Sequence, residues 1–422
     1  MKFLIKELLR AIDLLNHGQA DAALTLSHQL NRKHPSDARV WQLIGLCKLK
    51  LHEYTAAIDY LKRAASKISN GELFLGLAKA YVGLGRWEDA VQASQQAIAL
   101  DSTDVQAYVT CVIALESQKK YLEMRSVLSR GFSLAPYHPE LCFVAAKHGI
   151  YFGGHDLFEH ELLLKLESHQ FADEIRALGY SALACCAHEK NCFADAFGYQ
   201  SHANSLFSSK RHYDADRLLR YLQAFRIMSV DSGCDKDLEY DGVFPHLMIL
   251  GFSRSGKSLI ESLLSCNPKV QALGESKIFT DWVQRRIALK AGGSLLDYTM
   301  QLTLETAASE RLEYLIHLQQ YLKHLPTVIT IPDHVLALGV YARLFPHAPL
   351  VFVRRDLEDL GLACFFKFYR QDNAYSLSLE AIGREIALYE ALLSHWSVEL
   401  PNPIMQVAYE DLVENTVAVL HR

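Results

Sequence analysis

The sequence has no apolar run long enough to cross a membrane and no excess of basic residues. Because no stretch of 18 or more apolar residues occurs among its 422 residues, no membrane span is predicted. Lys and Arg number 43 against 48 Asp and Glu, so a nucleic-acid partner is not indicated. The start, MKFLIKELLRAIDLL, lacks the apolar core and small-residue cleavage site of a secretory signal peptide. We therefore expect a cytoplasmic protein.

Cysteine is present but shows no pattern of a metal site. Nine cysteines occur between Cys47 and Cys364, and the cluster Cys185, Cys186 and Cys192 lacks the paired spacing of zinc ligands. We interpret these residues as small buried hydrophobic side chains in a reducing compartment. The sequence therefore predicts neither a metal site nor disulfides.

The N-terminal half carries a repeated pattern. The segments GQADAALTLSHQL, HEYTAAIDYLKRA and GRWEDAVQASQQA align so that Ala23, Ala57 and Ala90 share one position, which Met124 takes in the next copy. Small residues at this period let two antiparallel helices cross closely. The pattern resembles the tetratricopeptide repeat, which is about 34 residues long. We expect five or six helical hairpins.

This resemblance implies an all-α solenoid over residues 1–228. Its concave groove would hold a peptide or a partner protein. The alternative is a stack of helices that only supports the rest of the chain. The helix expected at 214–227 is predicted to cap the solenoid, and the polar stretch 229–242 is interpreted as a linker.

From residue 243 onward, expected strands alternate with expected helices. The four strands are predicted at 247–250, 327–331, 350–353 and 404–407. This alternation is typical of a parallel α/β domain. Ligands of such sheets bind outside the carboxyl ends of the strands.

The first of these strands leads into a glycine-rich loop that is followed by helical spacing. Gly251 to Ser258 has the sequence GFSRSGKS, which matches the nucleotide-binding pattern G-x-x-x-x-G-K-[ST] at every fixed position. Backbone N–H groups of such a loop and of the helix N-terminus converge on an anion. The longer segment 251–270, GFSRSGKSLIESLLSCNPKV, also resembles the pattern GxPRSGTTLLxxxLxxHPxV. This is the 5′-phosphosulfate loop of sulfotransferases that use 3′-phosphoadenosine 5′-phosphosulfate (PAPS).

Segments further along the chain favour the second of these resemblances. FVRRDLEDLGLACFFKF, at 352–368, is similar to the family's 3′-phosphate segment RRDPxDxxLSxYFxxF. LFPHAPLVFVRRD and the YEDLV of 409–413 match two more of its motifs, in the same order. A triphosphatase needs a second acid to hold Mg²⁺, but Asp356 follows two arginines, which suits an anion better than a metal.

The chain thus resembles tetratricopeptide-repeat sulfotransferases related to tyrosylprotein and heparan sulfotransferases. The resemblance implies a P-loop-like parallel α/β domain over 243–422 that uses PAPS and no metal. The acceptor would be a hydroxyl of a peptide, protein or glycan. The nucleotide would be held by Gly251, Arg254, Ser255, Gly256, Lys257, Ser258 and Arg355.

The family's general base is a Glu in the context HPxVxxxGE. Here NPKV at 267–270 leads to Gly274 and Glu275, so the resemblance assigns the base to Glu275. The alternative role for this Glu is an acid at a helix N-terminus. Thr330 stands where the family has a lysine that stabilises the leaving oxygen. We hypothesise that Lys257, which replaces the first Thr of RSGTT, supplies that charge.

Other positions also depart from the family pattern. Ala363 replaces the Ser that accompanies Arg355 on the 3′-phosphate, and Leu357 replaces a Pro. No counterpart of the family's C-terminal segment precedes Arg422, which leaves open whether the domain is shortened there. Two alternatives therefore remain: a P-loop kinase or nucleotidase that uses Mg-ATP, and a degenerate, inactive sulfotransferase that acts as a scaffold through its repeats.

Overall fold

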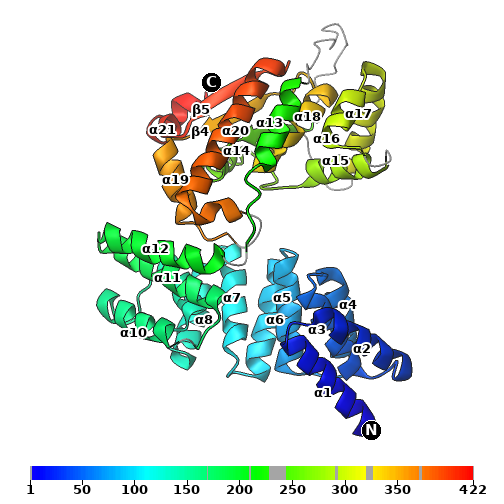
Figure 1. Ribbon diagram of the computed structural model, residues 1–422, viewed down its shortest axis with the longest axis vertical. Coiled ribbons are helices and arrows are strands. Elements are labelled where there is room, and N and C mark those ends of the chain that lie inside the picture. Colours follow the sequence, from blue (N-terminus) through cyan, green and yellow to red (C-terminus); the bar gives the residue numbers. More distant parts are fainter. Residues whose placement is uncertain are drawn as a thin grey trace. The chain divides into compact units, whose positions relative to one another are not determined.

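The computed structural model describes residues 2–168, 170–208, 211–227, 244–289, 293–319, 327–369 and 373–421. Two compact units make up the chain, Met1–Leu206 and Phe207–Arg422. The first consists of helices and the second of a sheet with helices (Figure 1).

The first unit confirms the predicted helical repeats. The small residues of the aligned position, Ala23, Ala57 and Ala90, are completely buried, and Met124 is 2% exposed. Gly45 shows how closely the helices pack, since an added Cβ would lie 2.6 Å from the Leu61 side chain. The helices are α1 Lys2–Asn16, α2 Ala20–Lys33, α3 Ala38–Lys50, α4 Tyr54–Ala65, α5 Gly71–Gly83, α6 Trp87–Leu100, α7 Val105–Ser117, α8 Tyr121–Leu134, α9 Pro139–Lys147, α10 His155–Glu167, α11 Asp173–Glu189 and α12 Phe193–Ser208.

Capping residues recur with the same period as the small residues. Asp37, Asn70 and Asp104 precede α3, α5 and α7, and each side chain accepts a hydrogen bond from a backbone N–H of the first turn. Each such cap satisfies a donor that the helix itself leaves unpaired. The polar caps therefore fix where the first helix of each repeat begins.

Helix α13, Arg217–Ile227, lies in the second unit, so the prediction that it caps the solenoid is wrong. Its apolar face of Leu218, Leu222 and Phe225 is buried in the core of that unit. The Phe225 ring lies 4.8 Å from the ring of Trp396, measured between centroids. The division between the units falls after Leu206, and the predicted linker, 229–242, lies outside the described residues.

The second unit is built on a parallel five-stranded sheet of order β2-β3-β1-β4-β5. At its centre, Met248 of β1 pairs with Ile329 of β3 on one side and with Leu350 of β4 on the other. The four predicted strands are present, and the two-residue β2 was not predicted. The strands are β1 His246–Leu250, β2 Gln271–Ala272, β3 Thr327–Ile329, β4 Leu350–Arg354 and β5 Ile404–Ala408.

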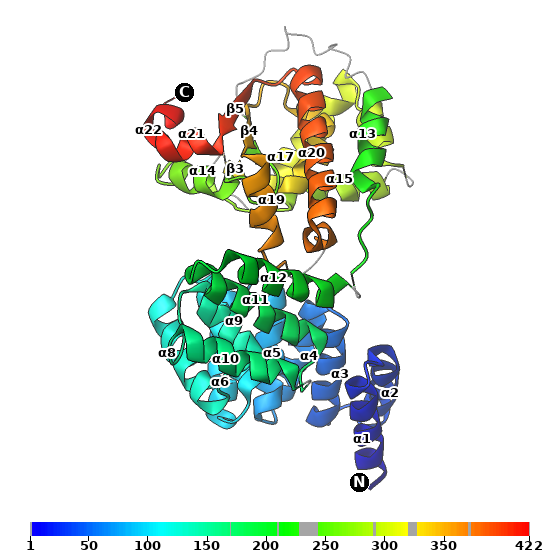
Figure 2. The same cartoon turned by 60° about the vertical axis from the view of Figure 1, so that its left-hand side comes forward.

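Helices cover both faces of this sheet. Figure 2 shows α14, α21 and α22 on one side and α20 with α13 on the other. The remaining elements join the strands and extend the second face. Besides α13, the helices of this unit are α14 Lys257–Leu264, α15 Ile278–Leu289, α16 Leu295–Gln301, α17 Leu304–Gln319, α18 Leu338–Leu344, α19 Leu357–Phe365, α20 Leu379–Glu399, α21 Tyr409–Glu414, α22 Thr416–Leu420 and the 3₁₀ helices η1 Pro332–Ala337 and η2 Ala374–Leu377.

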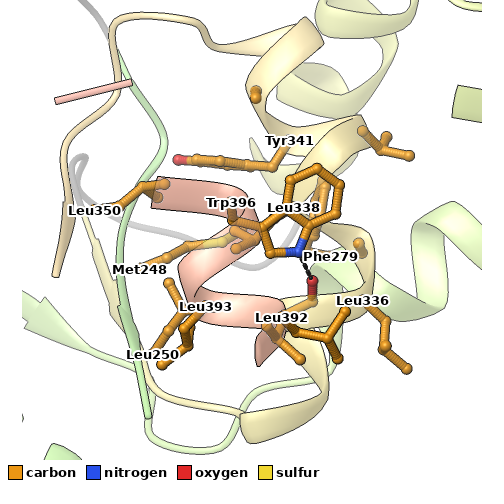
Figure 3. Close-up of a cluster of buried hydrophobic side chains, with 14 of the residues drawn as sticks. Met248, Leu250, Phe279, Leu336, Leu338, Tyr341, Leu350, Leu392, Leu393 and Trp396 are labelled. Carbon is orange, nitrogen blue, oxygen red and sulfur yellow. Dashed lines mark hydrogen bonds between the residues drawn. The ribbon is translucent and has the colours of Figure 1, made fainter. Parts of the chain in front are cut away.

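Successive side chains of each strand point to opposite faces of the sheet, so the core is divided into two parts, one on each face. Met248 and Leu250 point toward Trp396 of α20, whose indole N–H donates to the Val335 carbonyl at 2.8 Å (Figure 3). Ile249 and Val351 belong to the other cluster, which α14 and α21 cover. Helices therefore pack against both faces of the sheet. Among the described helices, none is apolar over the length needed to cross a membrane.

Candidate functional site

The glycine-rich loop lies where β1 ends and α14 begins. Its two glycines have no room for a side chain. A Cβ on Gly251 would lie 2.6 Å from the Val353 carbonyl oxygen, and one on Gly256 would collide with the Tyr409 ring. Gly256 also has φ 102°, in the region that favours glycine. The loop is therefore held against β4 and against the start of α21.

The loop has the features of an anion cradle. Among the described residues, the buried Ser255 hydroxyl has no hydrogen-bond partner. Arg254 is exposed and has φ 69°, and Ser258 is exposed in the first turn of α14. The N-terminus of α14 adds unpaired backbone N–H groups to this cradle. These features fit a phosphate or phosphosulfate group.

Lys257 is buried inside the loop, with 5% of its surface exposed. Its ammonium group donates to the carbonyl oxygens of Gly251 and Phe252 at 2.8 and 2.7 Å. Burial lowers the pKa of Lys257 to about 8, although the carboxylate of Glu275 opposes this shift. In this structure the ammonium therefore stabilises the loop conformation from within.

This lowered pKa predicts that anion binding weakens in alkaline solution. A bound anion favours the ammonium form and raises the pKa of Lys257, so binding takes up a proton above pH 8. Affinity for 3′-phosphoadenosine 5′-phosphate, the nucleotide that the sequence resemblance implies, should thus fall between pH 8 and 10 by up to about tenfold per pH unit. Calorimetric titrations at pH 7, 8 and 9 measure this trend. The variant Lys257→Met should show a flat profile, and an equal slope in both proteins would contradict the prediction.

Arg355 follows β4, beside the loop. Its Nη1 donates to the Arg254 carbonyl at 3.1 Å, and its guanidinium lies 4.5 Å from the centre of the Tyr409 ring. Nη2 lies 3.4 Å from an Asp359 carboxylate oxygen. Tyr409 thus contacts both Gly256 and Arg355, and it sets the spacing between the loop and this guanidinium.

The start of α19 is fixed by acids. Asp356 caps the helix by accepting the backbone N–H groups of Glu358 and Asp359, each at 3.0 Å. The Asp356 N–H in turn donates to Glu410. Leu357 is 59% exposed in the first turn, and Ala363 lies in the last turn with no side-chain donor.

Glu275 follows β2, on the other side of the loop. The backbone at the preceding residue, Gly274, accepts a hydrogen bond from the Thr330 N–H at 3.1 Å and donates one to Glu261 at 2.5 Å. Glu275 itself is exposed, whereas Thr330 is buried, with its hydroxyl 3.4 Å from the second Glu261 oxygen. Position 330 therefore faces a buried carboxylate.

A cavity of about 320 Å³ opens between Glu275 and the loop. Tyr369 donates to or accepts from Ser253 at 2.8 Å, and the Tyr389 hydroxyl accepts the Gly251 N–H at 3.3 Å. Sequence reasoning missed these tyrosines because they lie more than a hundred residues from the loop and belong to no local motif. The cavity is lined by Phe252, Ser253, Glu275, Lys277, Asp333, Tyr369, Tyr375, Glu385 and Tyr389, with Arg217 and Leu218 of α13 and with Ile331, Pro332, Val335 and Asn373.

The sequence-predicted residues therefore surround the carboxyl ends of neighbouring strands. In the strand order β2-β3-β1-β4-β5, the connection after β1 runs to one side of the sheet, toward β2, and the connection after β4 runs to the other side, toward β5. The two connections therefore diverge between the neighbouring strands β1 and β4. Open α/β sheets bind their ligands in the crevice at such a point. Gly251 to Ser258 lie at one side of it and Arg355 at the other, with Glu275 facing the adjoining cavity.

Comparisons with known proteins give a family match within each unit. A model of the sulfotransferase family matches residues 245–422, and a tetratricopeptide-repeat model matches residues 8–72. A protein of Aquifex aeolicus (strain VF5), described as uncharacterized, is 24% identical over an alignment of 187 residues, and the match covers 41% of this chain and 24% of that protein. The chain thus spans about a quarter of the length of that relative.

Among solved structures, several chains match about half of this chain. The tetratricopeptide-repeat protein TTC0263 of Thermus thermophilus is 20% identical, covers 43% of this chain and 98% of its own length, and gives a TM-score of 0.36. MamA is 15% identical, with coverages of 48% and 97% and a TM-score of 0.30. A chain of the APC/C hetero-tetramer Cut9-Hcn1 is 18% identical, with coverages of 52% and 42% and a TM-score of 0.42.

Proposed function

We propose, from the premise that this chain joins tetratricopeptide repeats to a sulfotransferase-family domain, that it transfers a sulfuryl group from PAPS to a hydroxyl group. The acceptor is a peptide, protein or glycan. The observation that carries the proposal is the pair of anion-binding groups at one crevice. The loop of Gly251–Ser258 lies next to Arg355, whose guanidinium donates to a carbonyl of that loop.

Two adjacent anion sites suit a nucleotide with phosphates at both ends of its ribose. The loop N–H groups, Ser255, Ser258 and Arg254 would hold the 5′-phosphosulfate. Arg355 would make a charge-assisted contact to the 3′-phosphate, for which its planar guanidinium is well shaped. Tyr409 supports this assignment, since it buttresses the loop and the guanidinium together.

The reaction follows from the place of Glu275 at the edge of the cavity. The acceptor oxygen forms a bond to sulfur as the bond from sulfur to the bridging phosphate oxygen breaks. The electron pair of the broken bond leaves with 3′-phosphoadenosine 5′-phosphate. Glu275 takes the proton from the acceptor hydroxyl, as a positioned general base does. The cavity beside it has room for one side chain or one sugar ring.

Lys257 would counter the negative charge that develops on the leaving oxygen. Its ammonium lies under the loop, bonded to two loop carbonyls, and a preorganised charge at a dry site stabilises a transition state strongly. Thr330 has a neutral hydroxyl that lies beside Glu261, so no cation comes from that position. Without the lysine and serine of the family at 330 and 363, we expect slow turnover.

The repeats are proposed to hold the acceptor or a partner protein. Polar side chains bridge successive first helices: Gln42 donates to Glu72 at 2.8 Å, and Gln106 donates to Glu140 at 2.6 Å. Lys79, whose pKa is lowered by burial, donates to Gln106. Such a polar row suits a hydrophilic segment of polypeptide.

The cytosol remains the proposed location, on the sequence grounds given above.

Turnover of PAPS by the full chain tests this function. Mixtures of hydroxyl-bearing peptides and glycans should yield 3′-phosphoadenosine 5′-phosphate together with an equal amount of sulfated product. Nucleotide binding without any product would favour the scaffold alternative. Phosphorylated product from Mg-ATP, with none from PAPS, would favour the kinase alternative.

A further inference from the structure

Glu261 is a buried carboxylate beside the phosphate loop to which the mechanism gives no role. Glu261 lies on α14, one turn after Lys257, and only 8% of its surface is exposed. A buried carboxylate is costly unless hydrogen bonds compensate for lost hydration. Burial raises the pKa of Glu261, and the charge of Glu275 adds to that shift. An apolar residue would fill this place at lower cost if packing were its sole role.

The hydrogen bonds of Glu261 converge on the backbone that carries Glu275. One oxygen accepts the Gly274 N–H at 2.5 Å, and the other lies 3.4 Å from the Thr330 hydroxyl. Gly274 has φ 63°, in the left-handed region. Glycine adopts positive and negative φ about equally well, so without hydrogen bonds this turn could take other backbone conformations. Its carbonyl accepts the Thr330 N–H at 3.1 Å. Gly274 is therefore held by α14 on one side and by the end of β3 on the other.

We propose that Glu261 is a positioning residue that fixes Glu275 relative to the phosphate loop. The inference rests on the proposed function, in which Glu275 is the base. Because α14 begins at Lys257, a single turn of helix connects the loop that holds the donor to the carboxylate that holds Gly274. Displacement of a reacting group by about 1 Å can cost about 10²-fold in rate. Loss of this link should therefore lower kcat rather than donor affinity.

Three variants separate positioning from general support of the fold. Glu261→Gln keeps an oxygen for the Gly274 N–H, Glu261→Ala removes it, and Ser262→Ala is an exposed control on the same helix. In the Ala variant kcat should fall about 10–100-fold, with the dissociation constant of 3′-phosphoadenosine 5′-phosphate within about threefold of wild type. The Gln variant should recover most of kcat. Equal losses in both variants, or parallel losses of kcat, nucleotide affinity and melting temperature, would overturn the proposal.

Amide hydrogen exchange tests the link independently of activity. Exchange in the segment 271–277 should be faster in Glu261→Ala than in wild type and should return toward wild type in Glu261→Gln. Unchanged exchange in the Ala variant overturns the inference even if the wild type is an active sulfotransferase. If the wild type transfers no sulfuryl group, the proposed function fails, while faster exchange with recovery by Gln still establishes that Glu261 holds the Gly274 turn.

Discussion

Glu275→Gln is expected to slow sulfuryl transfer by about 10²–10⁴-fold, the contribution typical of a general base. Glutamine keeps the shape of the side chain at the cavity edge but cannot take the acceptor proton. In the proposed function, donor binding depends on the loop and on Arg355, so the dissociation constant of 3′-phosphoadenosine 5′-phosphate should stay unchanged. Single-turnover rates with PAPS and calorimetric titration of the product nucleotide measure the two effects separately.

Asp333→Asn is the matched control for this experiment. Asp333 lines the same cavity and is the next acid that could act as base. Its carboxylate oxygen lies 3.5 Å from the Arg217 guanidinium, so this carboxylate is already engaged by a cation. The Asn variant should keep most of the rate of transfer. Full activity in Glu275→Gln with a large loss in Asp333→Asn would move the base to Asp333.

Arg355→Ala is expected to weaken binding of nucleotides that carry a 3′-phosphate and to spare those that lack it. A charge-assisted hydrogen bond contributes on the order of 1.5–3 kcal/mol, which corresponds to roughly 10–150-fold in affinity. Titration of 3′-phosphoadenosine 5′-phosphate against adenosine 5′-monophosphate measures the difference. Equal losses for both nucleotides would contradict the assignment of Arg355 to the 3′-phosphate.

The neighbouring arginine supplies a control of the same charge. The Arg354 guanidinium pairs with Glu390, with Nε 3.0 Å from a carboxylate oxygen, and it also contacts Gln406 and Ser394. It is therefore directed away from the loop. Arg354→Ala should bind both nucleotides as the wild type does. A loss in this variant equal to that of Arg355→Ala would show that net charge, and not a contact, controls affinity.

Local sequence patterns predicted the framework of the fold. The period of Ala23, Ala57 and Ala90 reflects close helix crossings, and short apolar runs reflect strands buried on both faces. Helix α13 was misplaced because an apolar face of Leu218 and Leu222 shows that a helix is buried but not against which unit. The two residues of β2 are too few to produce a recognisable pattern.

The candidate site was predictable where it is contiguous in sequence. Gly251 to Ser258 form one motif because a phosphate cradle needs consecutive backbone groups. The contacts of Tyr369, Tyr389 and Glu261 depend on pairings between distant segments, which no local pattern specifies. The direction of the Lys257 side chain was not predictable either, because its place in the motif allows the ammonium to contact a phosphate as well as the loop carbonyls.

The central claim is that the crevice between β1 and β4 binds a nucleotide with a 3′-phosphate. Calorimetric titration of the full chain with 3′-phosphoadenosine 5′-phosphate, and separately with Mg-ATP, tests it most directly. One molecule of 3′-phosphoadenosine 5′-phosphate should bind per chain, equally well with and without EDTA, and more tightly than Mg-ATP. Binding of Mg-ATP that is lost on chelation, with no binding of 3′-phosphoadenosine 5′-phosphate, would contradict the claim.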